Sequence, residues 1–113
     1  MADLKEPRIC ASTALAERGL GYRFECVRDG RPAAAFVVRH EGRPRAFFNH
    51  CPHRGHELDW TPGVFYDAEG HLLVCASHGA RYDPATGQCR SGPCSGALEA
   101  IAVVEEQGWI LLG

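Results

Sequence analysis

Two short segments that contain cysteine and histidine constrain this chain more than any other feature. The first reads Cys51-Pro52-His53 and the second reads Cys75-Ala76-Ser77-His78, with Gly55 and Gly79 shortly after the histidines. A cysteine and a histidine separated by one or two residues can reach the same metal from one tight loop. The spacing therefore predicts a metal site in which two facing loops supply four ligands.

Two kinds of metal centre suit this ligand set. One is a tetrahedral zinc, and the other is a [2Fe-2S] cluster with two cysteines on one iron and two histidines on the other. Zinc-finger spacing normally groups the cysteines together and the histidines together. Each segment is mixed here, which favours the dinuclear iron centre and leaves zinc as the alternative.

The residues around the ligands resemble the Rieske family, whose motifs read C-x-H-x-G-x-x-L and C-x-x-H-G-x-x-[FY]-D. This chain reads CPHRGHEL over residues 51–58 and CASHGARYD over residues 75–83, followed by the turns Pro84–Gly87 and Ser91–Pro93 in the family's order. The resemblance covers essentially the whole chain. It implies an all-β fold, a Rieske-like antiparallel β-sandwich, formed by one domain over residues 1–113 with a small cluster-binding lobe inserted at about residues 48–95.

The resemblance also implies roles for individual residues. Cys51 and Cys75 would hold the inner iron of one [2Fe-2S] cluster, and His53 and His78 would hold the outer iron at the exposed tip. Imidazole is a weaker electron donor than thiolate, so this ligand set raises the reduction potential above that of an all-cysteine cluster. Supporting positions around the cluster fall on Gly55, Gly79, Ala80, Tyr82 and Pro93.

Two of these positions bear on the potential. In high-potential members, a serine two residues after the second histidine and a tyrosine four residues after it donate hydrogen bonds to the cluster and cysteine sulfurs. The corresponding residues here are Ala80 and Tyr82. We therefore expect Tyr82 to keep one bond, to the Cys51 sulfur, and the serine bond to be lost. The predicted potential lies in the lower part of the Rieske range, which runs from about −150 to +300 mV.

The remaining cysteines are Cys10, Cys26, Cys89 and Cys94. Respiratory Rieske proteins join their two cluster loops by a disulfide, and neither loop here holds a cysteine besides its ligand. In a reducing cytosol we expect each of the four to be a free thiol. A local disulfide between Cys89 and Cys94 is the alternative, because these two residues flank the Ser91–Pro93 turn.

Composition indicates a small soluble protein. Its 113 residues suit one domain, 45% hydrophobic residues supply a modest core, and a formal net charge of −2 gives no indication of nucleic-acid binding. The first ten residues carry two acids, two bases and a proline, so we expect neither a signal peptide nor a membrane anchor. The expected protein is cytoplasmic, and a monomer unless it is a subunit of a larger complex.

Hydrophobic patterns predict mostly strands. Residues Tyr22–Val27 alternate with the period of a half-buried strand. Three hairpins are expected, formed by Ala35–Arg39 with Ala46–Asn49, Val64–Tyr66 with Leu72–Val74, and Ile101–Val104 with Trp109–Leu112. The first two hairpins lead directly into the two ligand segments. Only Ser12–Gly19 is predicted to be helical, for a turn or two.

The predicted function is electron transfer rather than catalysis. Rieske oxygenases need a further domain with a mononuclear iron, and 113 residues leave no room for it. We expect a soluble Rieske ferredoxin that passes electrons from a flavin-dependent reductase to an oxygenase or similar redox enzyme. The alternatives are a Rieske-like small subunit of a larger reductase, of the nitrite-reductase type, and a non-redox module that binds zinc or a cluster.

Four further residues near the ligands carry weaker expectations. Arg54 and Arg81 each lie within three residues of a ligand histidine, which predicts a basic rim that faces an acidic partner, with solvated charge as the alternative. His50 and His56 border the first ligand segment, and we expect them to be ordinary exposed side chains. The 21 residues between His53 and Cys75 are a few more than many family members carry, which predicts an extension around Trp60–Gly63.

Overall fold

A central antiparallel sheet organises the structure. The computed structural model describes residues 8–52, 57–76, 79–92 and 96–113. The sheet has the order β2-β3-β4-β8, with β2 at Tyr22–Arg28, β3 at Arg31–His40, β4 at Arg43–Phe48 and β8 at Ala100–Ile101. Two-residue turns with positive φ at both positions, Asp29-Gly30 and Glu41-Gly42, connect the first three strands. Such turns match the natural twist of a hairpin.

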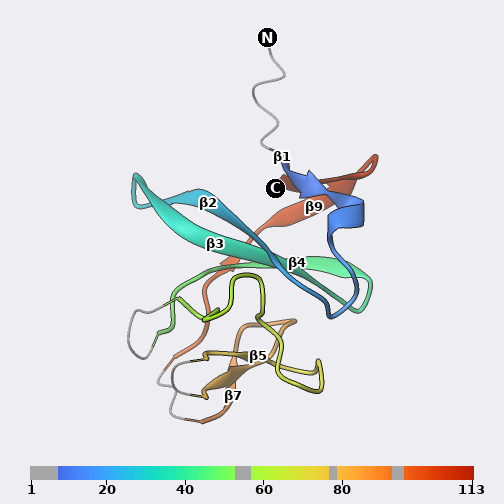
Figure 1. Cartoon of the computed structure of the whole chain (residues 1–113). Coiled ribbons are helices and arrows are strands. Elements are labelled where there is room, and N and C mark those ends of the chain that lie inside the picture. The colour runs from blue at the N-terminus through green and yellow to red at the C-terminus, as the bar shows by residue number, and fades with distance from the viewer. Residues whose placement is uncertain (1–7, 53–56, 77–78, 93–95) are drawn as a thin grey trace.

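Two smaller sheets cover the two faces of the central sheet, as Figure 1 shows. The first has the order β1-β10-β9 and contains β1 (Arg8–Ala11), β9 (Val103–Glu106) and β10 (Trp109–Leu112). The second has the order β5-β6-β7 and contains β5 (Leu73–Val74), β6 (Arg81–Tyr82) and β7 (Cys89–Ser91). The predicted all-β class with antiparallel sheets is confirmed.

Alternate residues of β3 belong to two different cores. Phe36 and Val38 pack in the core that also contains Cys51 and Cys75. Val37 packs in a second core, with residues of β1 and β10. Because successive side chains of a strand point to opposite faces, the central sheet is buried on both sides. Its aromatic and β-branched residues suit that position.

The predicted strands and hairpins agree with the structure except in two regions, near the C-terminus and between Val64 and Val74. Residues Ile101–Val104 were expected to form one strand, but Ala100–Ile101 pairs with β4 whereas Val103–Glu106 pairs with β10. The chain passes from one sheet to the other at Ala102. Each half pairs with a different strand, which local alternation does not distinguish. The Val64–Leu73 region forms a bridge at Tyr66 and Leu73 rather than a full hairpin.

The predicted helix over Ser12–Gly19 is wrong beyond its first turn. The 3-10 helix η2 covers only Ser12–Ala14. The Arg39 side chain donates hydrogen bonds to the carbonyls of Ser12 and Leu15, which a longer helix would use internally. No other helix occurs in the part of the chain that the structure describes, and none there has the length and apolarity to cross a membrane.

Candidate metal centre

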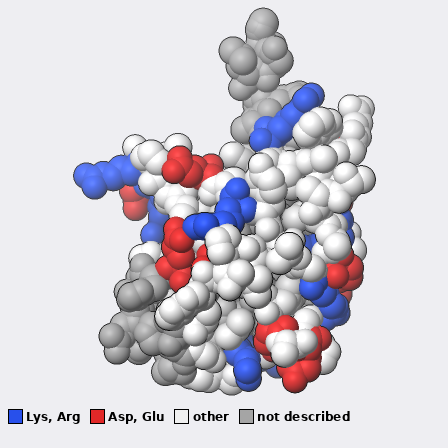
Figure 2. Space-filling view, in the orientation of Figure 1, with Lys and Arg blue, Asp and Glu red and all other residues white. Residues whose placement is uncertain are grey.

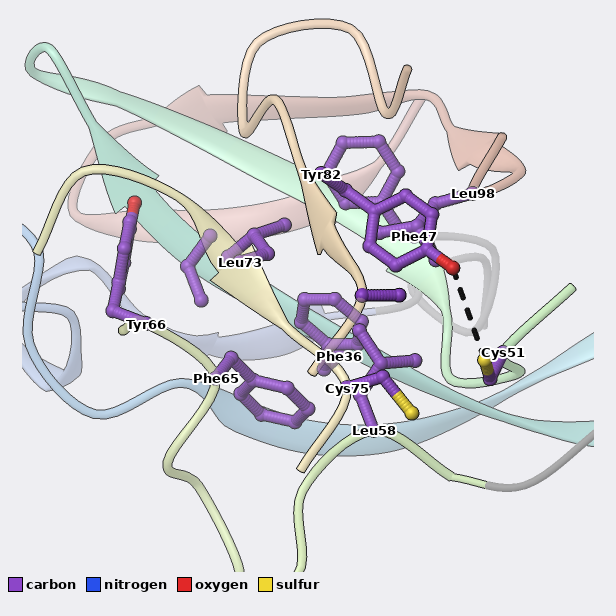
Figure 3. Close-up of a cluster of buried hydrophobic side chains, with 12 residues drawn as sticks. Phe36, Phe47, Cys51, Leu58, Phe65, Tyr66, Leu73, Cys75, Tyr82 and Leu98 are labelled. Carbon is purple, nitrogen blue, oxygen red and sulfur yellow. Dashed lines mark hydrogen bonds between the residues drawn. The ribbon is translucent and has the colours of Figure 1, made fainter. Parts of the chain in front are cut away.

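The two predicted cysteine ligands meet in one core. Cys51 lies shortly after the end of β4, and Cys75 directly follows β5. Both residues are 0% exposed and belong to the same buried cluster. Figure 3 shows their sulfur atoms at the same end of that cluster. The fold therefore brings together the two thiol groups that the sequence motifs single out.

Backbone hydrogen bonds shape the segment after Cys75. The amide of Gly79 donates to the carbonyl of Cys75, and the amide of Cys75 donates to the carbonyl of Ala80, both at 2.8 Å. Gly79 has a φ of 75°, which a glycine adopts without the cost that a side chain would add. These backbone contacts bring Cys75 close to Gly79 and Ala80, the described residues on either side of the second motif's histidine.

A buried asparagine connects the two ligand segments. Asn49 is 3% exposed, and its Oδ1 accepts a 2.7 Å hydrogen bond from the Leu58 amide. The carbonyl of Leu58 in turn accepts a 3.0 Å bond from the Ala76 amide. The first segment is thereby closed at its base and attached to the second. We call this set of contacts between Asn49, Leu58 and Ala76 the loop clasp.

Asp59 extends the loop clasp. Its Oδ1 accepts a 3.0 Å hydrogen bond from Asn49 Nδ2, and its Oδ2 accepts one of 3.0 Å from the Gly63 amide. Arg23 Nε lies 3.3 Å from the same Oδ2. The Trp60–Gly63 segment, where an extension was predicted, is thus held at both ends. The sequence patterns did not single out Asn49 and Asp59. Each is a polar residue directly after a large apolar one, Phe48 or Leu58, and that position could have marked it as a candidate buried hydrogen-bonding residue.

Tyr82 contacts the first cysteine. Its hydroxyl oxygen lies 3.8 Å from the Cys51 sulfur, the contact drawn in Figure 3. Burial, and then the hydrogen bond with Cys51, raise the pKa of Tyr82 far above its ordinary value, so the hydroxyl keeps its proton at neutral pH. A metal-bound thiolate has no proton of its own, so the tyrosine would be the donor. Ala80 is also fully buried and offers no hydroxyl.

The other described cysteines differ in whether they are free thiols or disulfide-bonded. Cys10 and Cys26 are free thiols, as predicted. Cys89 is disulfide-bonded, which corrects the expectation of a free thiol there. It stands opposite Tyr82 in the pairing of β6 with β7 and is exposed. An exposed sulfur is accessible to oxidation, unlike that of the buried Cys10. Cys94 lies outside the described residues.

Several predicted residues also lie outside the described residues, namely His53, Arg54, Gly55, His56, His78 and Pro93. Of the predicted basic rim, only Arg81 is described. Its side chain is 47% exposed and its Nε lies 3.9 Å from Asp67 Oδ2, so an acid partly offsets its charge. His50 is exposed and lines a hollow of about 210 Å³ with Arg28 and Pro52. Basic and acidic side chains are intermixed on the face in Figure 2.

The described donor groups fit an iron–sulfur centre. Two buried thiols from separate segments are the ligands that such a cluster takes from cysteine, and a buried hydroxyl donor at one sulfur is a common supporting contact. No set of three or more metal-binding side chains is found in residues 8–52, 57–76, 79–92 and 96–113. Two of the four predicted ligands lie outside those ranges.

Comparison with known proteins identifies the class. The Rieske [2Fe-2S] domain family matches residues 7–103, so this chain belongs to that family. A comparison with curated protein sequences gave no match.

Among solved structures, the ferredoxin of carbazole 1,9a-dioxygenase from Nocardioides aromaticivorans IC177 is similar, with 28% identity, a TM-score of 0.74 and 95% of each chain covered. The Sphingomonas yanoikuyae B1 ferredoxin has 22% identity and a TM-score of 0.72, over 96% of this chain and 97% of that one. A chain from a complex of reduced oxygenase and oxidized ferredoxin in carbazole 1,9a-dioxygenase has 21% identity and a TM-score of 0.72, over 95% and 91%. These last two similarities concern the fold alone.

Proposed function

We propose that this protein is a one-electron carrier with a single Rieske [2Fe-2S] cluster, which receives electrons from a flavin-dependent reductase and passes them to an oxygenase or another redox enzyme. The observation that carries the proposal is the burial of Cys51 and Cys75 in one core, with the Tyr82 hydroxyl at the Cys51 sulfur, in a chain of the Rieske family. Cys51 and Cys75 would bind one iron, and His53 and His78 the other.

The cluster would supply reversible one-electron chemistry when bound. The chain's own residues would do the rest. Burial of both cysteines excludes water from their sulfurs, and Tyr82 donates a hydrogen bond to one of them. The loop clasp holds the two ligand segments together at their described residues. The protein would thus act as a carrier and leave substrate chemistry to its partner.

Two similar structures support the choice of partner. One is a ferredoxin of a dioxygenase, and another comes from a complex of an oxygenase with its ferredoxin. Chemistry supports the proposed donor, because a flavin can deliver two reducing equivalents singly to a one-electron acceptor. We further propose a cytoplasmic protein with no nucleic-acid partner. The formal net charge of −2 supports the last point.

Spectroscopy with metal analysis tests the proposal. We expect the purified protein to be red-brown, to contain about two irons and matching sulfide per chain, and to give an EPR signal only after reduction with dithionite. The zinc alternative predicts a colourless protein with one zinc. A colourless zinc protein that anaerobic reconstitution leaves unchanged would overturn the proposed function. The nitrite-reductase-type alternative would instead keep the cluster and copurify with a large subunit.

A further inference from the structure

Asp59 has a buried carboxylate that accepts a hydrogen bond from Asn49, two residues before Cys51. Its side chain is 0% exposed. The groups around its oxygens are all donors, namely the Asn49 amide, the Gly63 amide and the Arg23 guanidinium. A set made only of donors suits an ionised carboxylate, which accepts hydrogen bonds and donates none. Asp59 is therefore a buried negative charge.

This charge is directly connected to both ligand segments. Asn49 stands two residues before Cys51, and its amide group joins Asp59 to the amide of Leu58. Leu58 is fully buried in the same core as Cys51 and Cys75, and its carbonyl accepts the Ala76 amide. The carboxylate thus orients Asn49, and Asn49 and Leu58 fix the distance between the two segments.

We propose that Asp59 is a positioning residue that holds the two ligand segments through the loop clasp, and that its buried charge lowers the midpoint potential of the cluster. The inference rests on the proposed function. Reduction adds one negative charge to the cluster, and a nearby carboxylate opposes that addition. Inside a protein such a repulsion is much less screened than at the surface. Arg23 offsets it only in part, because its side chain is 40% exposed.

The chain offers a matched control in Glu57. Arg23 Nη2 lies 2.6 Å from Glu57 Oε1, so Glu57 and Asp59 share one cationic partner. The Glu57 side chain is 47% exposed, whereas that of Asp59 is 0% exposed. Glu57→Gln and Asp59→Asn therefore each remove one negative charge that faces Arg23. The two removed charges differ in how deeply they are buried. Salt screens an exposed charge and leaves a buried one largely unscreened.

The experiment is a redox titration of the cluster-loaded wild type and of Asp59→Asn, Glu57→Gln and Arg23→Gln, each at low and high salt. We expect Asp59→Asn to move the midpoint potential in the positive direction at both salt concentrations. Glu57→Gln should give a smaller positive shift that disappears at high salt. Arg23→Gln should give a negative shift, because it removes a positive charge. Loosened loops alone would not produce shifts of opposite sign in Asp59→Asn and Arg23→Gln.

Each other outcome has a distinct meaning. Two results would overturn this inference and leave the proposed function standing, provided that the wild type shows a one-electron wave. One is an unshifted midpoint in Asp59→Asn, and the other is a shift of the same sign in Asp59→Asn and Arg23→Gln. The absence of any such wave in the loaded wild type would overturn both. If Asp59→Asn does not fold, the midpoint potential of Arg23→Gln is the test. A midpoint potential that does not move in the negative direction would then overturn the inference.

Discussion

The hydroxyl oxygen of Tyr82 lies 3.8 Å from the sulfur of Cys51, with both residues 0% exposed. Tyr82 belongs to β6 and Cys51 lies shortly after β4, so the contact joins the β5-β6-β7 sheet to the end of a central strand. A hydrogen bond to a cysteine sulfur stabilises the more negative, reduced state of an attached cluster. This contact therefore connects the packing of the core to the proposed redox function.

Replacing Tyr82 by Phe should lower the midpoint potential. Loss of a hydrogen bond worth about 1 kcal/mol in the reduced state corresponds to about 40 mV for a one-electron couple. Voltammetry of the loaded protein measures the shift. Tyr66→Phe is the control, because the Tyr66 hydroxyl is part-buried and donates to the Arg39 carbonyl at 2.9 Å instead of to a cysteine sulfur. Equal shifts in both variants would contradict the role given to Tyr82.

Replacing Ala80 by Ser should raise the midpoint potential. The residue is fully buried beside the second ligand segment, at the position where the resemblance to high-potential family members calls for a hydroxyl donor. One added hydrogen bond of about 1 kcal/mol again corresponds to about 40 mV. The same voltammetry measures it, with iron content as the check that the cluster is intact. An unchanged potential at full iron content would count against Ala80 as a cause of a low potential.

Replacing Gly92 by Ala should destabilise the second ligand segment. A Cβ on Gly92 would lie 2.8 Å from Ala80 Cα and 2.9 Å from the Gly79 carbonyl oxygen, both backbone atoms. Gly30→Ala is the control, because Gly30 also has a positive φ but a Cβ there meets nothing within 4 Å. We expect about 1 kcal/mol of destabilisation for Gly30→Ala from φ alone and clearly more for Gly92→Ala. Denaturant unfolding and iron retention provide the readouts.

Replacing Glu105 by Gln should cost about 1–2 kcal/mol of stability at neutral pH. Arg39 binds both carboxylate oxygens, at 3.0 and 2.8 Å, and the two side chains are only 14% and 29% exposed. Glu99→Gln is the control, because the Arg28–Glu99 pair is exposed on both sides. Its loss should cost well under about 1 kcal/mol.

The contribution of Glu105 should also depend on pH. The hydrogen bond from Arg39 holds the pKa of the Glu105 carboxyl below its ordinary value. The stability that the pair contributes is therefore fully present above the ordinary glutamate pKa and is lost as pH falls through the lower, folded-state value. The difference in unfolding free energy between wild type and Glu105→Gln should shrink over that acidic range. A difference that is constant with pH would contradict this account.

Local sequence patterns predicted much of the fold. The hairpin of β3 and β4 was predictable because its strands alternate regularly and its turn, at Glu41-Gly42, is short. The helix predicted within Ser12–Gly19 is limited to one 3-10 turn because Arg39, distant in sequence, takes the backbone carbonyls of that segment. The division at Ala102 was missed because both halves of the segment have the same local pattern while they pair with different sheets.

The sequence by itself determined the type of site, because ligand identity and spacing within each motif are local properties of the chain. Cys51 and Cys75, each followed by a histidine two or three residues later, were sufficient to predict a mixed-ligand metal centre and the Rieske family, and the family was then confirmed. Only the tertiary structure decided which side chains support that site. Asp59 is buried against Asn49 and Arg23 because three separate segments pack together, and no local pattern encodes a contact of that kind.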